Sequence, residues 1–307
     1  MRTAVGQRGV TVVVKLFYNQ YISRETRLVY SLIALIMLVG FAYMGINALT
    51  THYPGFNYVP LRWVILAPFI LGVTLLAMAA HQSAPRLAKF TQAYGTFFFL
   101  VLSFAILTTG VQLTPFHRID NFLATLDQAI GINTPALMAW TAHHVYIHKL
   151  LETAYDFLYV EIVAVPLLLP FFKGNKIVDR FFITMIVAFL IGTTFYYFFP
   201  TAAPASVFHS AYFMPGEHAT FIKFYKIHHG QSVASGDGGL IAFPSFHVAW
   251  AVILTCAMYP KKWLFIPLLI MNFLLIIATV LLGFHYLVDV FGGIALAALA
   301  IFISYLI

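Results

Sequence analysis

Long uninterrupted apolar runs are the feature that most limits what this chain can fold into. About 20 consecutive apolar residues form a helix long enough to cross the hydrocarbon layer of a bilayer. The sequence of 307 residues holds eight stretches of about that length, near 28–49, 60–80, 94–112, 153–172, 181–199, 243–260, 263–282 and 285–306. It therefore predicts an all-α fold, a polytopic membrane helical bundle of about eight transmembrane helices.

The composition supports a protein embedded in lipid. Only 9% of the residues are charged, compared with roughly 25% in soluble domains, which excludes an ordinary water-soluble globule. The net charge of +7 could suggest a nucleic-acid partner. However, the basic residues are not clustered among surface aromatics, so we expect no nucleic-acid binding. The single cysteine, Cys256, excludes an intrachain disulfide.

The basic residues indicate the topology, because Lys and Arg near helix ends prefer the cytoplasmic side. With the N-terminus inside, most of the 17 basic residues are cytoplasmic: Arg2, Arg8, Lys15, Arg24, Arg27, Arg86, Lys89, Lys173, Lys176, Arg180, Lys261 and Lys262. We therefore predict that both termini are cytoplasmic. Basic flanks without a targeting segment fit a multi-pass protein of the bacterial inner membrane, with an active site facing the periplasm.

Three regions follow from this topology. We expect a cytoplasmic N-terminal segment at 1–27, N-terminal transmembrane helices at 28–112, and a catalytic membrane core at 113–307. Two long outer segments, 113–152 and 200–242, lie in this core. The first contains an amphipathic stretch suited to the membrane interface, and the second is rich in Gly and Pro.

The first motif that can carry chemistry opens the sixth predicted span. The sequence Phe-Pro-Ser-Phe-His places Ser245 and His247 at the start of a helix, with Pro244 in the first turn. The unpaired N–H groups and the dipole at a helix N-terminus favour an anion such as phosphate. This position therefore predicts a phosphate site.

The second motif, His-Tyr-Leu-Val-Asp, opens the last span. His285 and Asp289 are four residues apart, so on a helix they share one face. The carboxylate can hold one ring nitrogen as a donor and leave the other free to attack. A charge inside a span costs about 2.5–3.5 kcal/mol, so Asp289 needs a partner such as this histidine. The seventh span returns the chain to the outer side, which places His285 at the depth of His247.

These two motifs resemble the type 2 phosphatidic acid phosphatase superfamily of membrane phosphoesterases. The likeness runs from Tyr196 to the end of the chain and is strongest to the branch containing inositol phosphorylceramide synthases. It implies that His285 attacks phosphorus, Asp289 orients and charges it, and His247 protonates the leaving oxygen. A phosphohistidine would then pass to water or to an acceptor alcohol. The substrate would be a membrane lipid phosphate, with no metal and no cofactor.

The chain departs from the phosphatases of that superfamily in two places. Ala278 and Thr279 stand where the phosphatases have Ser-Arg, and Phe199–Pro204 replaces their basic first motif. Without arginine the site loses a bidentate anion clamp. We therefore expect phosphodiester headgroup transfer in preference to hydrolysis of a phosphomonoester or pyrophosphate.

Further residues are candidates for substrate binding. Besides Ser245, these are Tyr155 and Asp156 near the fourth span and Lys226 in the second outer segment. For Tyr155, Asp156 and the nearby Glu161, hydrogen bonding between helices is an equally good interpretation. Lys223, Lys226, His228 and His229 could also restore positive charge. His143, His144 and His148 fall short of a metal site, which needs a third ligand at a known spacing.

Three other functions remain open at this point. The enzyme could be a lipid phosphate or prenyl pyrophosphate phosphatase, which shares the covalent step. A membrane transporter could use Asp156, Glu161 and Asp289 as ion ligands, although no duplicated halves are visible. A non-catalytic lipid-binding protein could retain the triad as a relic.

Overall fold

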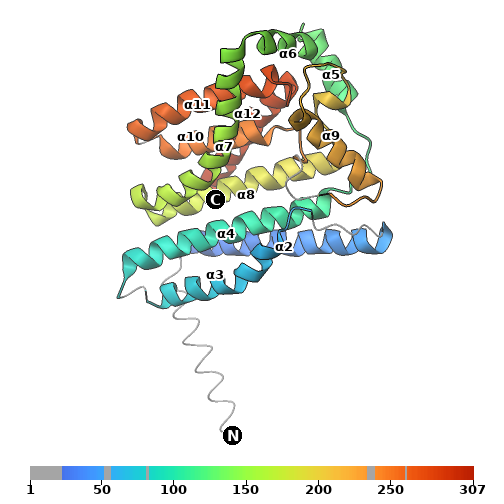
Figure 1. The fold of residues 1–307 in the computed structure, drawn as a ribbon. Coiled ribbons are helices and arrows are strands. Elements are labelled where there is room, and N and C mark those ends of the chain that lie inside the picture. The colour runs from blue at the N-terminus through green and yellow to red at the C-terminus, as the bar shows by residue number, and fades with distance from the viewer. Residues whose placement is uncertain (1–22, 52–56, 81–82, 234–238, 260) are drawn as a thin grey trace.

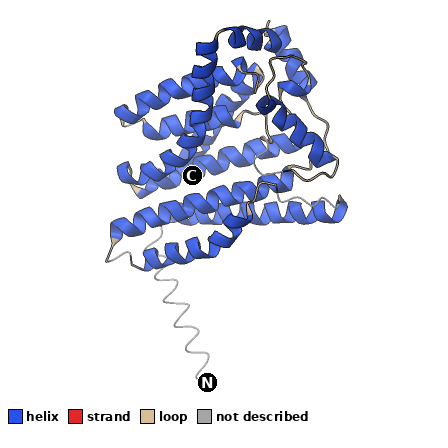
Figure 2. Ribbon diagram, in the orientation of Figure 1, coloured by secondary structure: helices blue, strands red, loops and turns tan. Residues whose placement is uncertain are grey.

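The computed structural model describes residues 23–51, 57–80, 83–233, 239–259 and 261–307, and every regular element among them is helical (Figure 2). The α-helices are α2 (Arg24–Thr50), α3 (Leu61–Ala79), α4 (Pro85–Val111), α5 (Asp120–Ala129), α6 (Thr134–His143), α7 (Val145–Phe172), α8 (Asn175–Phe198), α9 (Pro215–His228), α10 (Phe246–Met258), α11 (Lys262–Leu281) and α12 (Leu287–Leu306). A 3₁₀ turn, η1, covers Pro204–Ser206.

Among the described residues, seven helices are long and apolar enough to cross a membrane: α2, α3, α4, α7, α8, α11 and α12. The predicted fold class, a polytopic helical bundle, is confirmed. The predicted sixth span, 243–260, contains only the 13-residue α10, which rises about 20 Å. The number of crossings and the side of each terminus stay predictions, as does the division into three regions. The predicted segment 1–27 lies almost entirely outside the described residues.

The helices pack in layers (Figure 1). Helices α2, α3 and α4 lie together, α8 lies beside them, and α7, α10, α11 and α12 complete the bundle. Small residues allow α2 and α4 to approach closely, as is common between membrane helices. A Cβ atom added at Gly40 would lie 2.8 Å from the side chain of Ile106, and one added at Gly110 would lie 2.9 Å from the Gly40 carbonyl oxygen.

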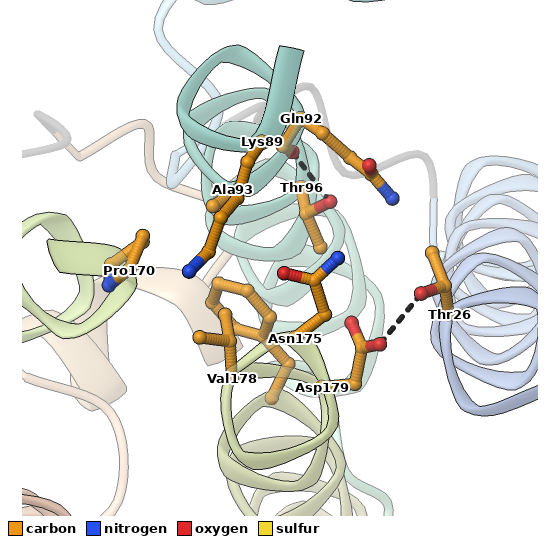
Figure 3. Close-up of a pocket in the computed structure, with 10 residues that line it drawn as sticks. Thr26, Lys89, Gln92, Ala93, Thr96, Pro170, Asn175, Val178 and Asp179 are labelled. Atoms are coloured by element: carbon orange, nitrogen blue, oxygen red, sulfur yellow. Dashed lines mark hydrogen bonds between the residues drawn. The ribbon is translucent and has the colours of Figure 1, made fainter. Parts of the chain in front are cut away.

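Polar side chains join the helices at the end of the bundle where α2 begins (Figure 3). The Thr26 hydroxyl donates to a carboxylate oxygen of Asp179 at 2.6 Å, which connects α2 to α8. The Lys89 ammonium donates to the Lys173 carbonyl at 2.7 Å, which connects α4 to the end of α7. The cavity between these groups has a volume of about 20 Å³, which suits one water molecule. These bonds cross-link the helices here, and the small cavity between them has no room for an organic substrate.

Helices α5, α6 and α9 gather at the opposite end of the bundle (Figure 1). Here the predicted outer segment 113–152 forms α5, α6 and the start of α7, with a break between α6 and α7 at His144. The segment 200–242, predicted from its turn formers, also contains the 14-residue helix α9. Arg118 connects the two segments, because its guanidinium lies 3.5 Å from Asp120 and 5.3 Å from the centroid of the Phe221 ring.

Candidate active site

The start of α10 is set by Ser245. Its hydroxyl accepts a hydrogen bond from the Val248 N–H at 3.3 Å, and the helix begins at the next residue, Phe246. Pro244 thus lies one residue before the cap, not in the first turn as the sequence suggested. The physical reason is that the serine hydroxyl satisfies a free N–H of the first turn, which makes serine the better cap. Ser245 is completely buried.

Helix α12 begins at Leu287, after a turn that contains His285. Gly283 adopts a φ of +80° in this turn, a conformation that residues with a side chain rarely adopt. The Asp289 carboxylate accepts from the Tyr286 N–H at 3.0 Å and so caps its own helix. The prediction that His285 and Asp289 share one regular helix is therefore wrong, because His285 lies before the start of α12. The hydrogen bonds of the cap hold the two residues together instead of a helical turn.

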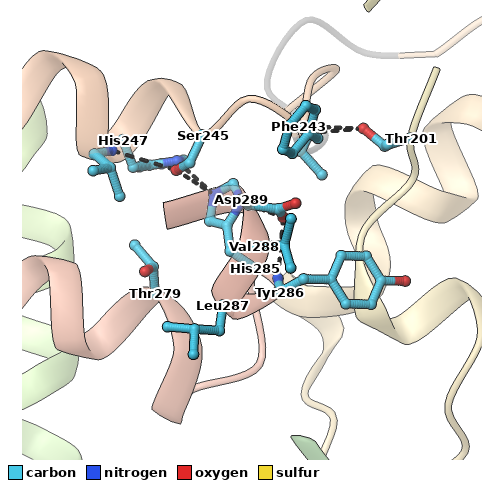
Figure 4. Close-up of polar contacts among 12 residues, drawn as sticks. Thr201, Phe243, Ser245, His247, Thr279, His285, Tyr286, Leu287, Val288 and Asp289 are labelled. Atoms are coloured by element: carbon cyan, nitrogen blue, oxygen red, sulfur yellow. Dashed lines mark hydrogen bonds and ion pairs between the residues drawn. The ribbon is translucent and has the colours of Figure 1, made fainter. Parts of the chain in front are cut away.

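Ser245, His247, His285 and Asp289 converge in one cluster (Figure 4). Nδ1 of His285 lies 3.1 Å from Oδ2 of Asp289. Nε2 of His285 lies 3.2 Å from Nδ1 of His247 and 3.3 Å from Oγ of Ser245. When the carboxylate accepts the hydrogen on Nδ1, Nε2 keeps its lone pair. His285 then has the tautomer and the orientation of a nucleophile.

The backbone around His285 is also fixed. Its N–H donates to the Thr279 carbonyl at 2.8 Å, and the Ser245 N–H donates to the Asp289 carbonyl at 3.2 Å. Ala278 and Thr279, which replace the Ser-Arg of the phosphatases, are both fully buried. Their contribution here is to packing and to the position of the His285 backbone.

Two aspartates of α5 support the site, a role that was not predicted from the sequence. Both carboxylate oxygens of Asp127 accept from the first turn of α12, at 2.7 Å from the Leu287 nitrogen and 3.1 Å from the Val288 nitrogen. Burial raises the pKa of the Asp127 carboxyl, and the two backbone hydrogen bonds oppose this shift. A carboxylate is favoured at a helix N-terminus by the helix dipole. Helix α5 thus supplies a second cap to α12 from elsewhere in the chain.

Asp120 stabilises the segment that replaces the basic first motif of the phosphatases. Both of its carboxylate oxygens lie 3.0 Å from the Ala202 nitrogen. Burial raises the pKa of Asp120 to about 6, although the Ala202 N–H and the Arg118 charge act in the other direction. Next to it, the Thr201 hydroxyl accepts from the Phe243 N–H at 2.9 Å, just before the Ser245 cap (Figure 4). Asp120 and Asp127 are seven residues apart, two helical turns, and this spacing was the signal available in the sequence.

The histidines face a large cavity of about 1080 Å³. This exceeds the roughly 300–1000 Å³ of ordinary small-molecule pockets. Three of the predicted substrate-binding residues, Tyr155, Asp156 and Lys226, line it. Its walls come from the segment before α3, from α7, α9 and α10, and from the loops beside them. The aromatic residues among these are Tyr58, Tyr155, Tyr159, Phe246, Trp250 and Phe284.

Tyr155 positions the ring of His247. Its ring stacks on His247 with centroids 4.6 Å apart and on Phe284 with centroids 4.2 Å apart. The tyrosine therefore lies between the two rings and limits the orientations open to His247. This stacking of Tyr155 on His247 was not predicted from the sequence.

Lys223 brings positive charge to the cavity from α9. The side chain lines the cavity but is only 1% exposed, and its ammonium lies 4.0 Å from the centroid of the Tyr58 ring. A cation over an aromatic face is attracted by the ring electrons. From the sequence, Lys223 was only one of several basic residues that could bring positive charge, because α9 was not expected and Tyr58 is distant in the chain.

The remaining candidate groups lie elsewhere. Glu161 accepts from the Asn272 amide at 2.7 Å, a buried bond between α7 and α11, and does not line the cavity. Nδ1 of His143 and of His144 each face a backbone carbonyl one turn earlier. Within the described ranges, no group of three or more His, Cys, Asp or Glu side chains could hold a metal ion.

The order of these elements and their motifs can be compared with known families. A model of the PAP2 superfamily matches residues 121–303, from α5 to the end of α12. The chain belongs to the PAP2 superfamily. Comparison with curated proteins and with solved structures found no match.

Membership of the PAP2 superfamily confirms the resemblance at this level. It supports a phosphatase-type lipid enzyme, and with the apolar helices it fits a lipid phosphate substrate in a bilayer. The matched range includes both histidine motifs and Asp127, and it begins one residue after Asp120. It does not assign the synthase-like branch, which stays a prediction.

Proposed function

We propose that this PAP2 protein is a metal-independent lipid phosphotransferase that moves a phosphodiester headgroup through a phosphohistidine intermediate. The observation that carries the proposal is the geometry of His285. One ring nitrogen is held by Asp289, and the other meets His247 and Ser245 at the wall of the large cavity. This arrangement supports nucleophilic catalysis with an acid–base partner within hydrogen-bond reach.

In the first step, Nε2 of His285 attacks phosphorus and forms a P–N bond. The bond from phosphorus to the leaving oxygen breaks, and a protonated His247 transfers its proton to that oxygen. Asp289 balances the positive charge that develops on the His285 ring. Burial of this pair strengthens the interaction, because His285 is 3% exposed and Asp289 is fully buried.

In the second step, the neutral His247 removes a proton from the acceptor hydroxyl. The acceptor oxygen attacks phosphorus, and the P–N bond breaks to restore His285. An alcohol as acceptor gives transfer, whereas water gives hydrolysis. The cavity of about 1080 Å³ has room for a headgroup and an acceptor at once, which supports transfer.

The charge of the cavity favours a phosphodiester. Among the described residues, the ordinarily charged side chains that line it are Lys223, Lys226 and Asp156, which together carry a net charge of +1. A phosphodiester has one negative charge, whereas a phosphomonoester or pyrophosphate has more. The carboxylate of Asp156 can in addition accept hydrogen bonds from hydroxyls of a headgroup or acceptor.

The lipid can enter from the side of the bundle. Tyr159 on α7 and Ile222 on α9 line the cavity and are 61% and 45% exposed. The cavity thus reaches the apolar outer surface of the bundle between these residues. A diacyl lipid can keep its tails in the bilayer while its phosphate reaches the histidines.

The test is a transfer assay with purified protein in lipid vesicles. Labelled phosphatidic acid, a prenyl pyrophosphate and diester phospholipids are offered separately with an alcohol acceptor. We expect a labelled headgroup on the acceptor from a diester, and none with His285→Ala. His209→Ala, a matched change at an exposed histidine, should leave transfer intact.

Two results would contradict the proposal in different ways. Release of inorganic phosphate from a monoester, lost in His285→Ala, would establish a phosphatase instead. No His285-dependent product from any substrate would favour the transporter or the lipid-binding protein. Trapping of a phosphorylated protein in the wild type, but not in His285→Ala, would test the intermediate directly.

A further inference from the structure

A second cavity lies at the end of the bundle away from the histidines. It has a volume of about 250 Å³ and is bordered by the C-terminal parts of α7, α10 and α12 and by the N-terminal part of α8. The short α10 explains it. This helix ends at Met258, while α8 runs for 24 residues and α12 for 20, so a hollow remains below the end of α10.

The charges at this cavity are positive in the part of the chain that the structure describes. There, Lys173 and Arg180 are the charged side chains among the lining residues, and no acid is among them. Lys261 lies close enough to lower the pKa of the Lys173 ammonium, an effect smaller than that of burial. The Arg180 guanidinium lies 4.4 Å from the centroid of the Tyr305 ring, which holds it at the cavity. The nearby salt bridge of Glu25 involves Lys176, which does not line the cavity.

The interior of the cavity is apolar. Below the two cations, its walls are formed mainly by aliphatic and aromatic side chains: Leu169, Ile177, Phe181, Ile253, Ala257 and Ile301. A small soluble anion gains nothing from such walls. A phospholipid gains from both parts, because its phosphate pairs with the cations and an acyl chain fills the apolar hollow.

We propose that this cavity, lined by Lys173 and Arg180, binds an anionic phospholipid of the leaflet opposite to the active site. The site is separate from the cavity of the histidines, since α10 contributes its first residues to one and its last residues to the other. The proposal does not depend on the reaction proposed above. It assigns the basic residues at this end of the bundle a specific ligand in addition to their effect on topology.

The only cysteine of the chain provides the probe. Cys256 lines this cavity and is exposed, so a bound lipid would cover its thiol. The protein is placed in vesicles of phosphatidylcholine alone, or of phosphatidylcholine with phosphatidylglycerol. Alkylation of Cys256 by N-ethylmaleimide, which is uncharged, is then followed by mass spectrometry. We expect phosphatidylglycerol to slow alkylation several-fold in the wild type.

Variants separate this binding from the general effect of a negative surface on a thiol. The double change Lys173→Gln and Arg180→Gln should remove the protection, with an affinity weakened roughly 30-fold, as about 1 kcal/mol per cation implies. Lys176→Gln, on the same helix as Arg180 but outside the cavity, should keep the protection. If the double variant unfolds, Lys173→Gln alone should lose part of the protection.

Three outcomes would overturn the proposal. Alkylation could proceed equally fast in both kinds of vesicle, or the slowing could persist in the double variant. Alternatively, glycerol phosphate added to phosphatidylcholine vesicles could protect Cys256 as well as the lipid does. That last result would show a site for a soluble phosphate.

Discussion

The contact between α12 and the start of α10 gives the sharpest test of the site geometry. Gly293 lies where the two backbones meet, and a Cβ atom added there would be 2.5 Å from the Ser245 carbonyl oxygen and 2.8 Å from the Val248 Cβ. Real Cβ contacts are not shorter than 3.0 Å, so Gly293→Ala must move the Ser245 backbone by about half an ångström. We expect this shift to disturb the 3.3 Å contact between the Ser245 hydroxyl and His285.

The expected magnitude follows from two opposing terms. Alanine is better than glycine inside a helix by about 1 kcal/mol. Overpacking costs about 1–3 kcal/mol, so the net loss of stability should lie between about 0 and 2 kcal/mol. A misplacement of about 1 Å can cost on the order of 100-fold in rate. For half that shift we expect roughly a tenfold loss of His285-dependent turnover in vesicles.

Two neighbouring changes serve as controls for Gly293→Ala. At Gly292 an added Cβ would meet the ring of Phe243 at 2.7 Å, and a ring can rotate away more easily than a backbone carbonyl can. Gly292→Ala should therefore lose less activity. At Gly45 nothing lies within 4 Å, so Gly45→Ala should keep full activity. Wild-type turnover and an unchanged melting temperature in Gly293→Ala would refute the reasoning.

The other predictions concern the supporting groups. Asp127→Ala should lower the melting temperature and the turnover, by the equivalent of about 1.5–3 kcal/mol for a charged hydrogen-bond acceptor, and Asp127→Asn should fall between it and the wild type. Burial raises the pKa of Asp120 from 3.8 to about 6, so between these pH values the folded state binds a proton that the unfolded state has lost. Stability should thus fall as the pH rises from about 4 to 6, by up to about 3 kcal/mol, and Asp120→Asn should lack this component in pH-dependent melting curves. Lys223→Gln should raise KM several-fold more than Lys226→Gln in vesicle assays, because Lys223 is the more deeply buried cation. Equal KM values for the two variants would contradict a role of Lys223 in substrate binding. Treatment with a chelator should leave turnover unchanged, and complete loss of turnover would show that the reaction needs a metal.

The seven long apolar helices, and the proximity of His285 to Asp289, could be predicted from the sequence because both depend on local patterns. Apolar runs of sufficient length indicated the long helices, and the spacing of His285 and Asp289 indicated their contact. The span ends were less predictable: α4 begins at Pro85 and α7 at Val145, eight or more residues before the apolar runs that we identified. Hydropathy measures the apolar part of a helix, whereas the helix itself continues into polar sequence.

Long-range contacts explain what was missed. Tyr58 reaches the cavity from the N-terminal helices, and no local pattern links it to Lys223. The stacking of Tyr155 on His247 likewise depends on how α7 crosses the bundle. Helix α9 was not predicted because its segment is rich in Gly and Pro, although Pro215 is well suited to the first turn of a helix.

The double cap on α12 has a mechanical consequence. Asp127 belongs to the short helix α5, in which the apolar residue Phe122 is 60% exposed. Through Asp127, the same helix holds the first turn of α12 by two hydrogen bonds. The sequence predicts that α5 lies in the membrane interface, and a change in its depth or tilt there would be transmitted through these bonds to the turn that carries His285. The lateral pressure and curvature of the membrane would then act on the alignment of His285, the proposed nucleophile. The physical state of the bilayer would itself be a variable of the proposed reaction's rate.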